Sequence, residues 1–166
     1  MRETSMCRII FALACMAAGL TGMAPLARAD TIAHYECAVV GFPSPELIGD
    51  RPDHSLMTVE YSCVGVDGLL KGVVYTASNT VEWDGPKGTF LVGTGIHRIP
   101  GGRAVMQLTE GTAAVVTKDG KPVGNETSGK GVVKFASGPL AALSGKTIKF
   151  VTKPVNPIRF TVELTD

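Results

Sequence analysis

Apolar and polar residues alternate with a period of two over most of the chain beyond residue 54. In the first such stretch, Met57, Val59, Tyr61 and Cys63 alternate with polar side chains. Successive side chains of a β-strand point to opposite faces, so this pattern predicts a half-buried strand with Cys63 on its apolar face.

The last segment of the chain has the clearest alternation. We expect Ile158, Phe160, Val162 and Leu164 to face inward, with Arg159 and its alternating neighbours facing outward. An unpaired edge invites aggregation, so we expect this strand to pair within the sheet with an early strand of the chain.

Turn sequences divide the chain into about eight strands. Asp67-Gly68, Pro100-Gly101-Gly102 and Asp119-Gly120 are typical of β-hairpin turns, and no segment after Asp30 has helical periodicity over three turns. The pattern predicts an all-β fold, a single antiparallel β-barrel, with a β-sandwich as the alternative. Glycines inside the predicted strands favour the barrel, because they relieve crowding where a small barrel bends sharply.

The first 29 residues have the pattern of a signal peptide. A charged start precedes an apolar run over residues 9–20, which is too short for a spanning helix, and Ala27-Arg28-Ala29 matches the small-x-small pattern that signal peptidase cuts. We therefore expect a mature chain that begins at Asp30 and keeps no membrane anchor. The alanine-rich signal indicates a bacterial protein that is periplasmic or secreted.

Residues 30–54 are predicted to be an irregular lead-in to a β-barrel domain at 55–166. Prolines at 43, 45 and 52 interrupt regular structure, because proline lacks the backbone donor and restricts the residue before it. Only residues 35–40 have the pattern of a short strand. We expect His34 and His54, which lie in this segment, to be exposed to solvent.

The charge balance excludes some classes of partner. The signal peptide removes three of the 16 basic residues and one of the 15 acidic residues, which leaves a mature chain with a formal charge of about −1. A nearly neutral domain without a basic run is not typical of nucleic-acid binding or of binding to acidic membranes.

Two of the four cysteines, Cys37 and Cys63, remain after signal cleavage. An even pair in an exported protein predicts a disulfide, and the absence of CxxC spacing argues against a reactive or metal-binding pair. By restricting the unfolded chain, such a bridge would stabilise the folded state by about 3 to 4 kcal/mol on the chain-entropy model.

The segment Ala136-Ser137-Gly138-Pro139-Leu140-Ala141-Ala142-Leu143-Ser144-Gly145 resembles the stretch G-T-G-x-F-A-G-x-x-G. Small antiparallel barrels of the allene oxide cyclase-like and dirigent-like type carry that stretch between two late strands. The resemblance covers residues 103–152. Ser137 stands for the threonine and Leu140 for the phenylalanine, Ala136 and Ala142 depart from glycine, and Pro139 is unusual at the unspecified position. It implies an eight-stranded barrel with an apolar cavity, of a type that often forms homo-oligomers, and it transfers no catalytic residue.

No sequence motif indicates catalysis, a metal site or a cofactor. The chain has no HExxH, no GxSxG and no GxxxxGK, and its three histidines are far apart. Three residues remain as candidates for ligand binding. His97 shares a strand face with Gly93 and Gly95, Trp83 is the single tryptophan, and Glu110 interrupts an apolar strand beside Gly111. The dipeptide Glu110-Gly111 also has the pattern of a β-bulge.

Three classes of function are compatible with these residues. The first is a non-enzymatic barrel that binds a small apolar ligand or a protein partner. The second is an isomerase or cyclase that holds an apolar substrate in a folded shape, which needs no recognisable motif. The third is an envelope or matrix protein whose surface is functional. A lumen with space and polar groups supports the first two, and a filled lumen supports the third.

We predict that the exported protein is cleaved after Ala29. The expected intact mass is that of a chain starting at Asp30, measured on protein recovered from the periplasm or the medium. A product that starts at Met1, or one that carries a lipid on Cys15, would contradict the prediction.

Overall fold

The computed structural model describes residues 31–166, so the predicted signal peptide and its cleavage site lie outside the described residues. Nine strands and one short 3-10 helix make up the described chain. They are β1 (Thr31–Val40), β2 (Glu46–Leu47), β3 (His54–Gly68), β4 (Val74–Asp84), β5 (Lys87–Ile99), β6 (Gly102–Lys118), β7 (Lys121–Ser137), η1 (Gly138–Leu143), β8 (Thr147–Asn156) and β9 (Arg159–Thr165).

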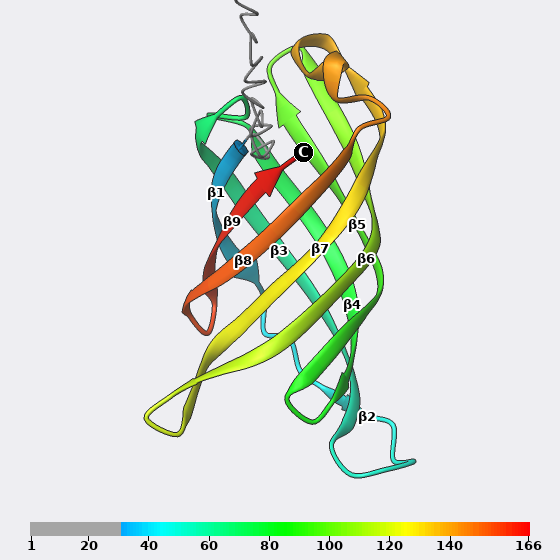
Figure 1. The fold of residues 1–166 in the computed structure, drawn as a ribbon, viewed down its shortest axis with the longest axis vertical. Helices are drawn as coiled ribbons and strands as arrows, with labels where there is room; N and C mark the ends of the chain where they lie inside the picture. The colour runs from blue at the N-terminus through cyan, green and yellow to red at the C-terminus, as the bar shows by residue number, and fades with distance from the viewer. Residues whose placement is uncertain (1–30) are drawn as a thin grey trace, which may run out of the picture.

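Eight long antiparallel strands close into a barrel (Figure 1). From β3 to β9 each long strand pairs with the next one in the chain, and β1 closes the ring by pairing with β9 on one side and β3 on the other. The predicted antiparallel barrel is confirmed, and the sandwich is not observed. The final strand pairs with the first, as expected for a sheet without open edges.

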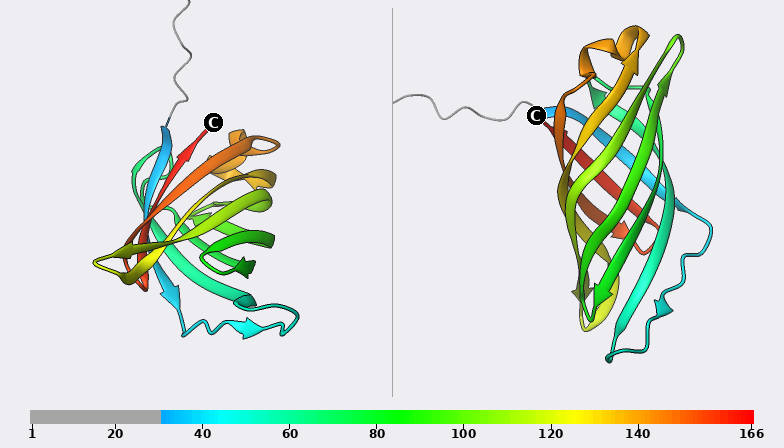
Figure 2. Two further views of the ribbon diagram at one scale, coloured as in Figure 1. Left: turned by 60° about the horizontal axis from the view of Figure 1, so that its bottom comes forward. Right: turned by 90° about the vertical axis from the view of Figure 1, so that its right-hand side faces the viewer.

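The N-terminal segment differs from the sequence-based expectation. Residues 31–40 form a full barrel strand, β1, where an irregular lead-in with a short strand was predicted. The reason is the alternation of buried Ala33, Tyr35 and Cys37 with more exposed neighbours, which the prolines further along obscured. Only the following connection is irregular, and its β2 adds to the beginning of β3, outside the barrel wall (Figure 2).

Two strands run through polar stretches without interruption. β4 extends from Val74 to Asp84, and β7 continues through Asn125. The bulge predicted at Glu110-Gly111 is present, since the β6–β7 register shifts between Leu108 and Glu110.

The predicted disulfide between Cys37 and Cys63 is confirmed. The two residues lie directly opposite each other in the β1–β3 pair, with their Cα atoms 4.0 Å apart. Both side chains are buried in the main core. The bridge therefore crosses the inner face of the pair that closes the barrel.

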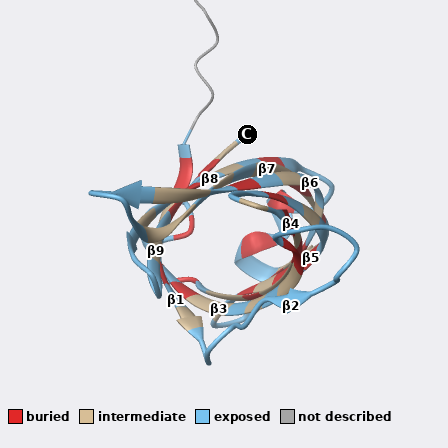
Figure 3. Cartoon of the chain, turned by 90° about the horizontal axis from the view of Figure 1, so that it is seen from below, coloured by how far each residue is buried: buried red, intermediate tan, exposed pale blue. Residues whose placement is uncertain are grey.

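One end of the barrel is plugged by apolar side chains. Leu140 and Leu143 of η1, together with Leu70 and Val73 of the β3–β4 connection, are all buried. Figure 3 looks into the opposite end, and η1 lies across the far end of the ring. We call the plugged end the upper end and the opposite one the lower end, as they stand in Figure 1.

Part of the plug, η1, lies within residues 136–145, the segment that resembles the G-T-G-x-F-A-G-x-x-G stretch. Gly138, the first residue of η1, has a φ of +58°, and a Cβ atom there would lie 2.0 Å from the carbonyl oxygen of Gly101. Glycine is the residue that tolerates both this backbone conformation and this close approach. The turn can therefore fold η1 back over the upper end.

The inward face of β9 agrees with its alternation, except at one position. Val162 and Leu164 are buried, and Phe160 is half-buried against the core. Ile158 was predicted to face inward, but this was wrong: it lies in the β8–β9 turn, 53% exposed. The Asn156 side chain accepts a hydrogen bond from the backbone N–H of Ile158, which shapes the turn and turns the side chain outward.

We predict that Phe160→Ala destabilises the barrel by about 2 to 4 kcal/mol, because it removes a large apolar side chain from the inner wall. The Phe160 ring packs edge-on against Tyr61, with ring centroids 5.3 Å apart. Its exposed neighbour provides the control, since Arg159→Ala should cost less than about 0.5 kcal/mol. Urea denaturation midpoints of the two variants are the measurement. Equal and small effects would mean that β9 contributes little to barrel stability.

Candidate functional site

A cavity of about 140 Å³ lies inside the barrel. All eight long strands contribute to its wall, which is mostly apolar. Its lining includes the exposed residues Asn156, Pro157 and Arg159 at the lower end, whereas the buried plug residues of the upper end are not part of it. The cavity is therefore blind at the upper end and opens at the lower end.

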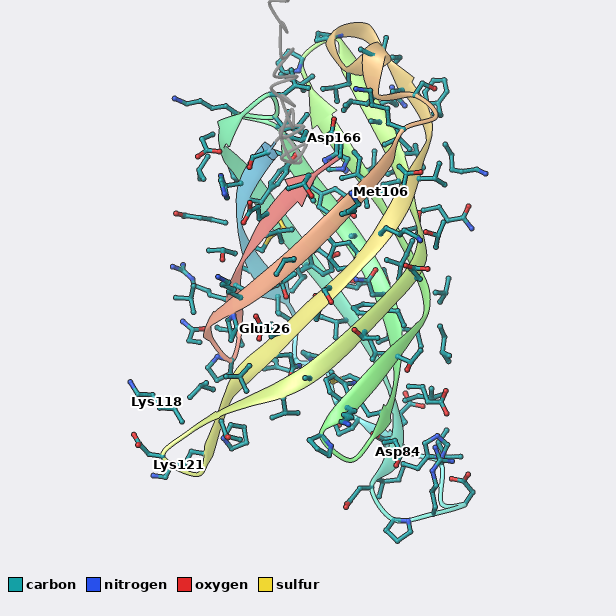
Figure 4. All side chains as sticks on the ribbon, in the orientation of Figure 1. Asp84, Met106, Lys118, Lys121, Glu126 and Asp166 are labelled. Carbon is teal, nitrogen blue, oxygen red and sulfur yellow. A yellow bond between two sulfur atoms is a disulfide. The ribbon has the colours of Figure 1, made fainter. Side chains whose placement is uncertain are left out.

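The lower rim is polar and extended. The β6–β7 hairpin projects beyond the barrel at this end, with Lys118 and Lys121 at its tip (Figure 4). Asn125 of β7 and Arg159 of β9 line the cavity near the opening. Charged groups thus stay at the rim, and the interior is left to aromatic and aliphatic side chains.

A cluster of five rings lies along the inner wall. Tyr75 stacks on His97 with ring centroids 4.1 Å apart and 15° between the planes. Tyr35 contacts both rings, with centroids 6.1 Å from Tyr75 and 5.8 Å from His97. Tyr61 packs edge-on between Tyr75 and Phe160. These rings come from five different strands, so the barrel assembles them from distant parts of the chain.

A glycine makes the stack on His97 possible. Gly95 lies opposite Ala77 on β4, and a Cβ atom at Gly95 would lie 2.3 Å from the Tyr75 ring. The Tyr75 ring therefore occupies the space that a side chain on β5 would take. This lets the ring lie flat along the strand and cover the imidazole of His97.

His97 is held in place inside the wall. Its side chain is 1% exposed, and its Nδ1 lies 2.9 Å from the hydroxyl oxygen of Tyr35. Burial lowers the pKa of His97 to about 4, so the ring is neutral at physiological pH. Its second ring nitrogen, Nε2, is buried and has no hydrogen-bond partner in the described part of the chain.

The three tyrosines keep the interior uncharged. Burial raises the pKa values of Tyr35, Tyr61 and Tyr75 above the ordinary range, so all three hydroxyls stay protonated. The Asn79 side-chain amide donates a hydrogen bond to the Tyr61 hydroxyl at 3.1 Å. The cavity wall thus contains neutral hydrogen-bonding groups in a mostly apolar surface.

Trp83 lies in the lower half of the cavity wall. It is 6% exposed and packs with Val81 and Ala113 in a small second core. Its indole Nε1 is buried without a hydrogen-bond partner among residues 31–166. Trp83 Nε1 and His97 Nε2 are the two buried side-chain polar atoms in this range that have no partner, and both residues line the cavity.

A β-bulge decides which residues of β5 face the cavity. Thr80 pairs with Val92 and Val81 pairs with Phe90, which leaves Leu91 as an extra residue in β5. Phe90 therefore lines the cavity together with Gly93, although the two are three residues apart. A strict alternation places them on opposite faces.

Glu110, the third predicted ligand-binding residue, lies elsewhere. Its side chain is 63% exposed and forms an ion pair with Lys130 on β7 at 3.0 Å. Glu110 is not among the residues that line the cavity, although Leu108 on the other side of the bulge is. Trp83 and His97 therefore share one cavity, and Glu110 does not.

Sequence reasoning did not single out the tyrosines of the wall. Tyr61 lies on the apolar face predicted for its strand, and Tyr35 begins the short strand predicted within the N-terminal lead-in. The signal that could have found them is the alternation itself, since inward positions of neighbouring strands meet in a closed barrel.

A second polar cluster lies outside the cavity, at the lower end. His54 was expected to be exposed, but this was wrong: its side chain is 8% exposed, between Asp50 and Glu82. Its Nδ1 is hydrogen-bonded to Asp50, and its Nε2 lies 2.8 Å from Glu82. These hydrogen bonds, first that to Asp50, raise the pKa of His54. His34, by contrast, is 44% exposed beside Asp67, as expected.

The cluster connects the β1–β3 connection to the barrel wall. Asp50 belongs to that connection, and Glu82 belongs to β4. The hydrogen bond from His54 lowers the pKa of Asp50. The hydrogen bonds of His54 to Asp50 and Glu82 therefore hold the irregular segment against the lower end of the sheet.

Comparison with known proteins gives no assignment. No protein-family model, no curated protein and no solved structure matches the chain. Within residues 31–166, no group of three or more His, Cys, Asp or Glu side chains is arranged to hold a metal ion. In the same range, no helix is long and apolar enough to cross a membrane.

We predict that the contribution of His54 to stability is greater at pH 6 than at pH 9. The pKa of His54 is raised in the folded state, so its protonation stabilises the fold. This contribution is complete at a pH below the unfolded-state pKa of about 6.5, and it is lost as the pH rises through the folded-state pKa. The measurement is the difference in thermal midpoint between the unmodified protein and His54→Gln at the two pH values. In an Asp50→Asn, Glu82→Gln background the difference should no longer depend on pH. An effect of His54→Gln that is the same at both pH values would contradict the prediction.

Proposed function

We propose that this protein binds a small, mostly apolar ligand inside the barrel, without transforming it. The observation that supports this best is the blind, mostly apolar cavity, whose lining includes the neutral hydrogen-bonding side chains of Tyr61 and Asn79. Ligand sites are typically concave and apolar, with a few polar groups that fix orientation. A lumen filled by side chains would instead have favoured a purely structural role.

The cavity volume limits the part of the ligand that can enter. At about 140 Å³ it is close to an engineered cavity of about 150 Å³ that binds benzene. It is smaller than the pockets of about 300 to 1,000 Å³ that enclose drug-sized ligands. The buried part of the ligand therefore has about the size of one six-membered ring, and any longer part extends through the lower opening.

The ionisation states favour binding over the alternative of an isomerase or cyclase. A general base works best when its pKa lies near the operating pH, whereas His97 has a pKa of about 4. The tyrosines around it are poor acids, because burial raises their pKa values. The wall is suited to holding a neutral molecule in place rather than to moving a proton.

We further propose that the binding protein is exported. The Cys37–Cys63 disulfide supports this, because such bridges persist in oxidising compartments. A distant relationship to the allene oxide cyclase-like barrels remains part of the proposal, and it rests on residues 103–152 alone. The eight-stranded architecture is compatible with it.

We predict that toluene, used as a ring-sized apolar probe, binds saturably and shifts the fluorescence of Trp83, the single tryptophan. Ala113→Phe should weaken this binding at least about tenfold, because Ala113 is buried in the wall beside Trp83 and a larger ring there fills the cavity. The matched control is Ala114→Phe, since Ala114 is the next residue of β6 and is exposed.

Overpacking costs about 1 to 3 kcal/mol, which is less than the total stability of most domains, so we expect both variants to fold. Circular dichroism of both variants checks that they do. Failure of toluene to bind, or equal binding by a folded Ala113→Phe variant, would show that the lumen is not the binding site.

A further inference from the structure

The side-chain amide of Asn79 lies on the inner wall of the barrel, midway along β4. Asn79 pairs with Val59 of β3 on one side and with Gly93 of β5 on the other. All three residues line the cavity, and Asn79 is half-buried. Residues directly opposite each other in neighbouring strands share a face of the sheet, so the Asn79 side chain lies on the cavity side.

Two contacts fix the direction of this amide. Its Nδ2 donates a hydrogen bond to the hydroxyl oxygen of Tyr61 at 3.1 Å. Its Oδ1 lies over Gly93, since a Cβ atom on Gly93 would be only 2.5 Å from that oxygen. Two side-chain carbons of Leu108 would be 3.0 and 3.1 Å from the same Cβ position. The missing side chain of Gly93 therefore leaves room for the carbonyl end of the amide.

The Asn79 Oδ1 is accessible and accepts no hydrogen bond from residues 31–166. The bond to Tyr61 is the one side-chain hydrogen bond of Asn79 in this range, and it uses Nδ2. The inaccessible side-chain polar atoms without a partner are those of Trp83 and His97, so the unpaired Oδ1 keeps accessible surface. Because the side chain lies on the inner wall, that surface belongs to the cavity. The cavity therefore contains an acceptor that the protein leaves unused.

The rest of the wall restricts the charge of a donor that could meet this oxygen. Among the described residues that line the cavity, none is Asp or Glu, so nothing there offsets the cost of desolvating a cation. An anion would place its own acceptor oxygens against Oδ1. The surrounding wall is mostly apolar, which favours a neutral donor on an apolar body.

We infer that the ligand is an uncharged alcohol, whose hydroxyl group donates a hydrogen bond to the Asn79 Oδ1 midway along the cavity. This inference rests on the proposed function and gives it a ligand class. A hydroxyl group supplies the donor and adds only one polar heavy atom to a body of about the size of one ring. A hydrocarbon, or a ketone without a donor, leaves Oδ1 unpaired.

The first test is the direction of the amide itself. Exchanging the amide nitrogen and oxygen would place a donor in the cavity, and hydrogen bonding decides between the two arrangements. In NOE spectra of the ligand-free protein, the side-chain NH₂ protons of Asn79 should show stronger NOEs to the Tyr61 ring than to the α-protons of Gly93. The reverse order would overturn the inference.

The second test compares ligands of matched size. Cyclohexanol carries a donor, cyclohexanone carries only an acceptor, and methylcyclohexane carries neither. The measured quantity is the ratio of the dissociation constant of cyclohexanone to that of cyclohexanol, obtained from NMR titrations. This ratio should fall about three- to tenfold from the unmodified protein to Asn79→Leu, which is the range expected for one hydrogen bond. Binding of methylcyclohexane to Asn79→Leu checks that the cavity is still open.

Thr127→Val is the matched control. Thr127 also lines the cavity and is half-buried, but its hydroxyl already has a partner, the Thr152 hydroxyl at 2.9 Å. The control should therefore leave the ratio unchanged, and an equal fall in both variants would overturn the assignment to Asn79. If circular dichroism shows that Asn79→Leu is unfolded, the Tyr61→Phe, Asn79→Leu double variant replaces it, because removing both partners of a hydrogen bond is better tolerated than removing one.

The remaining outcomes separate this inference from the function on which it rests. If cyclohexanol and methylcyclohexane bind but Asn79→Leu leaves the ratio unchanged, the cavity binds ligands and the alcohol inference is wrong. If cyclohexanone binds the unmodified protein more tightly than cyclohexanol, the donor class is wrong. If none of the three compounds binds the unmodified protein, the proposed function fails, and the inference fails with it.

Discussion

The barrel depends on the pairing of its first strand with the third. β1 is hydrogen-bonded to β9 and to β3, so its removal would leave an open edge on each of them. The Cys37–Cys63 bridge lies across the inner face of this pair and restricts the unfolded chain, a contribution of about 3 to 4 kcal/mol on the chain-entropy model. Tyr35 and Tyr61 lie two residues from these cysteines on the same inward faces. The bridge that closes the barrel therefore also fixes two walls of the cavity.

Closure gives the interior two regions with different roles. The upper half contains the main core, in which Leu70, Leu143, Val133 and Ile148 are nearly inaccessible to solvent. The lower half contains only a small core around Trp83, and there the cavity opens. The apolar burial that stabilises the fold is thus concentrated at the plugged end. The ring cluster lies at the boundary, where the wall changes from a packed core to a lined cavity.

Much of this architecture could be predicted from the sequence, because alternation and turn residues act locally. The β6–β7 turn at Asp119-Gly120 follows from two residues that tolerate positive φ, and the inward face of β9 follows from its period of two. Features set by distant partners could not be predicted in this way. His54 is buried because Asp50 and Glu82 lie on either side of it. Ile158 is exposed because Asn156 shapes a turn, and Glu110 faces outward because a bulge interrupts the strand.

The candidate site was harder to predict than the fold for a related reason. A catalytic motif places its residues at a fixed spacing, whereas His97 and the four rings grouped with it come from five strands and meet only when the barrel closes. Each inward position has the same local pattern as a core residue, so alternation identifies the wall without showing where space remains. The arrangement of the wall depends on small features such as Gly95, which leaves room for the Tyr75 ring, and the extra residue at Leu91. Because such features change the lining and leave the order of the strands unchanged, the chemistry of the cavity can vary while the barrel stays the same.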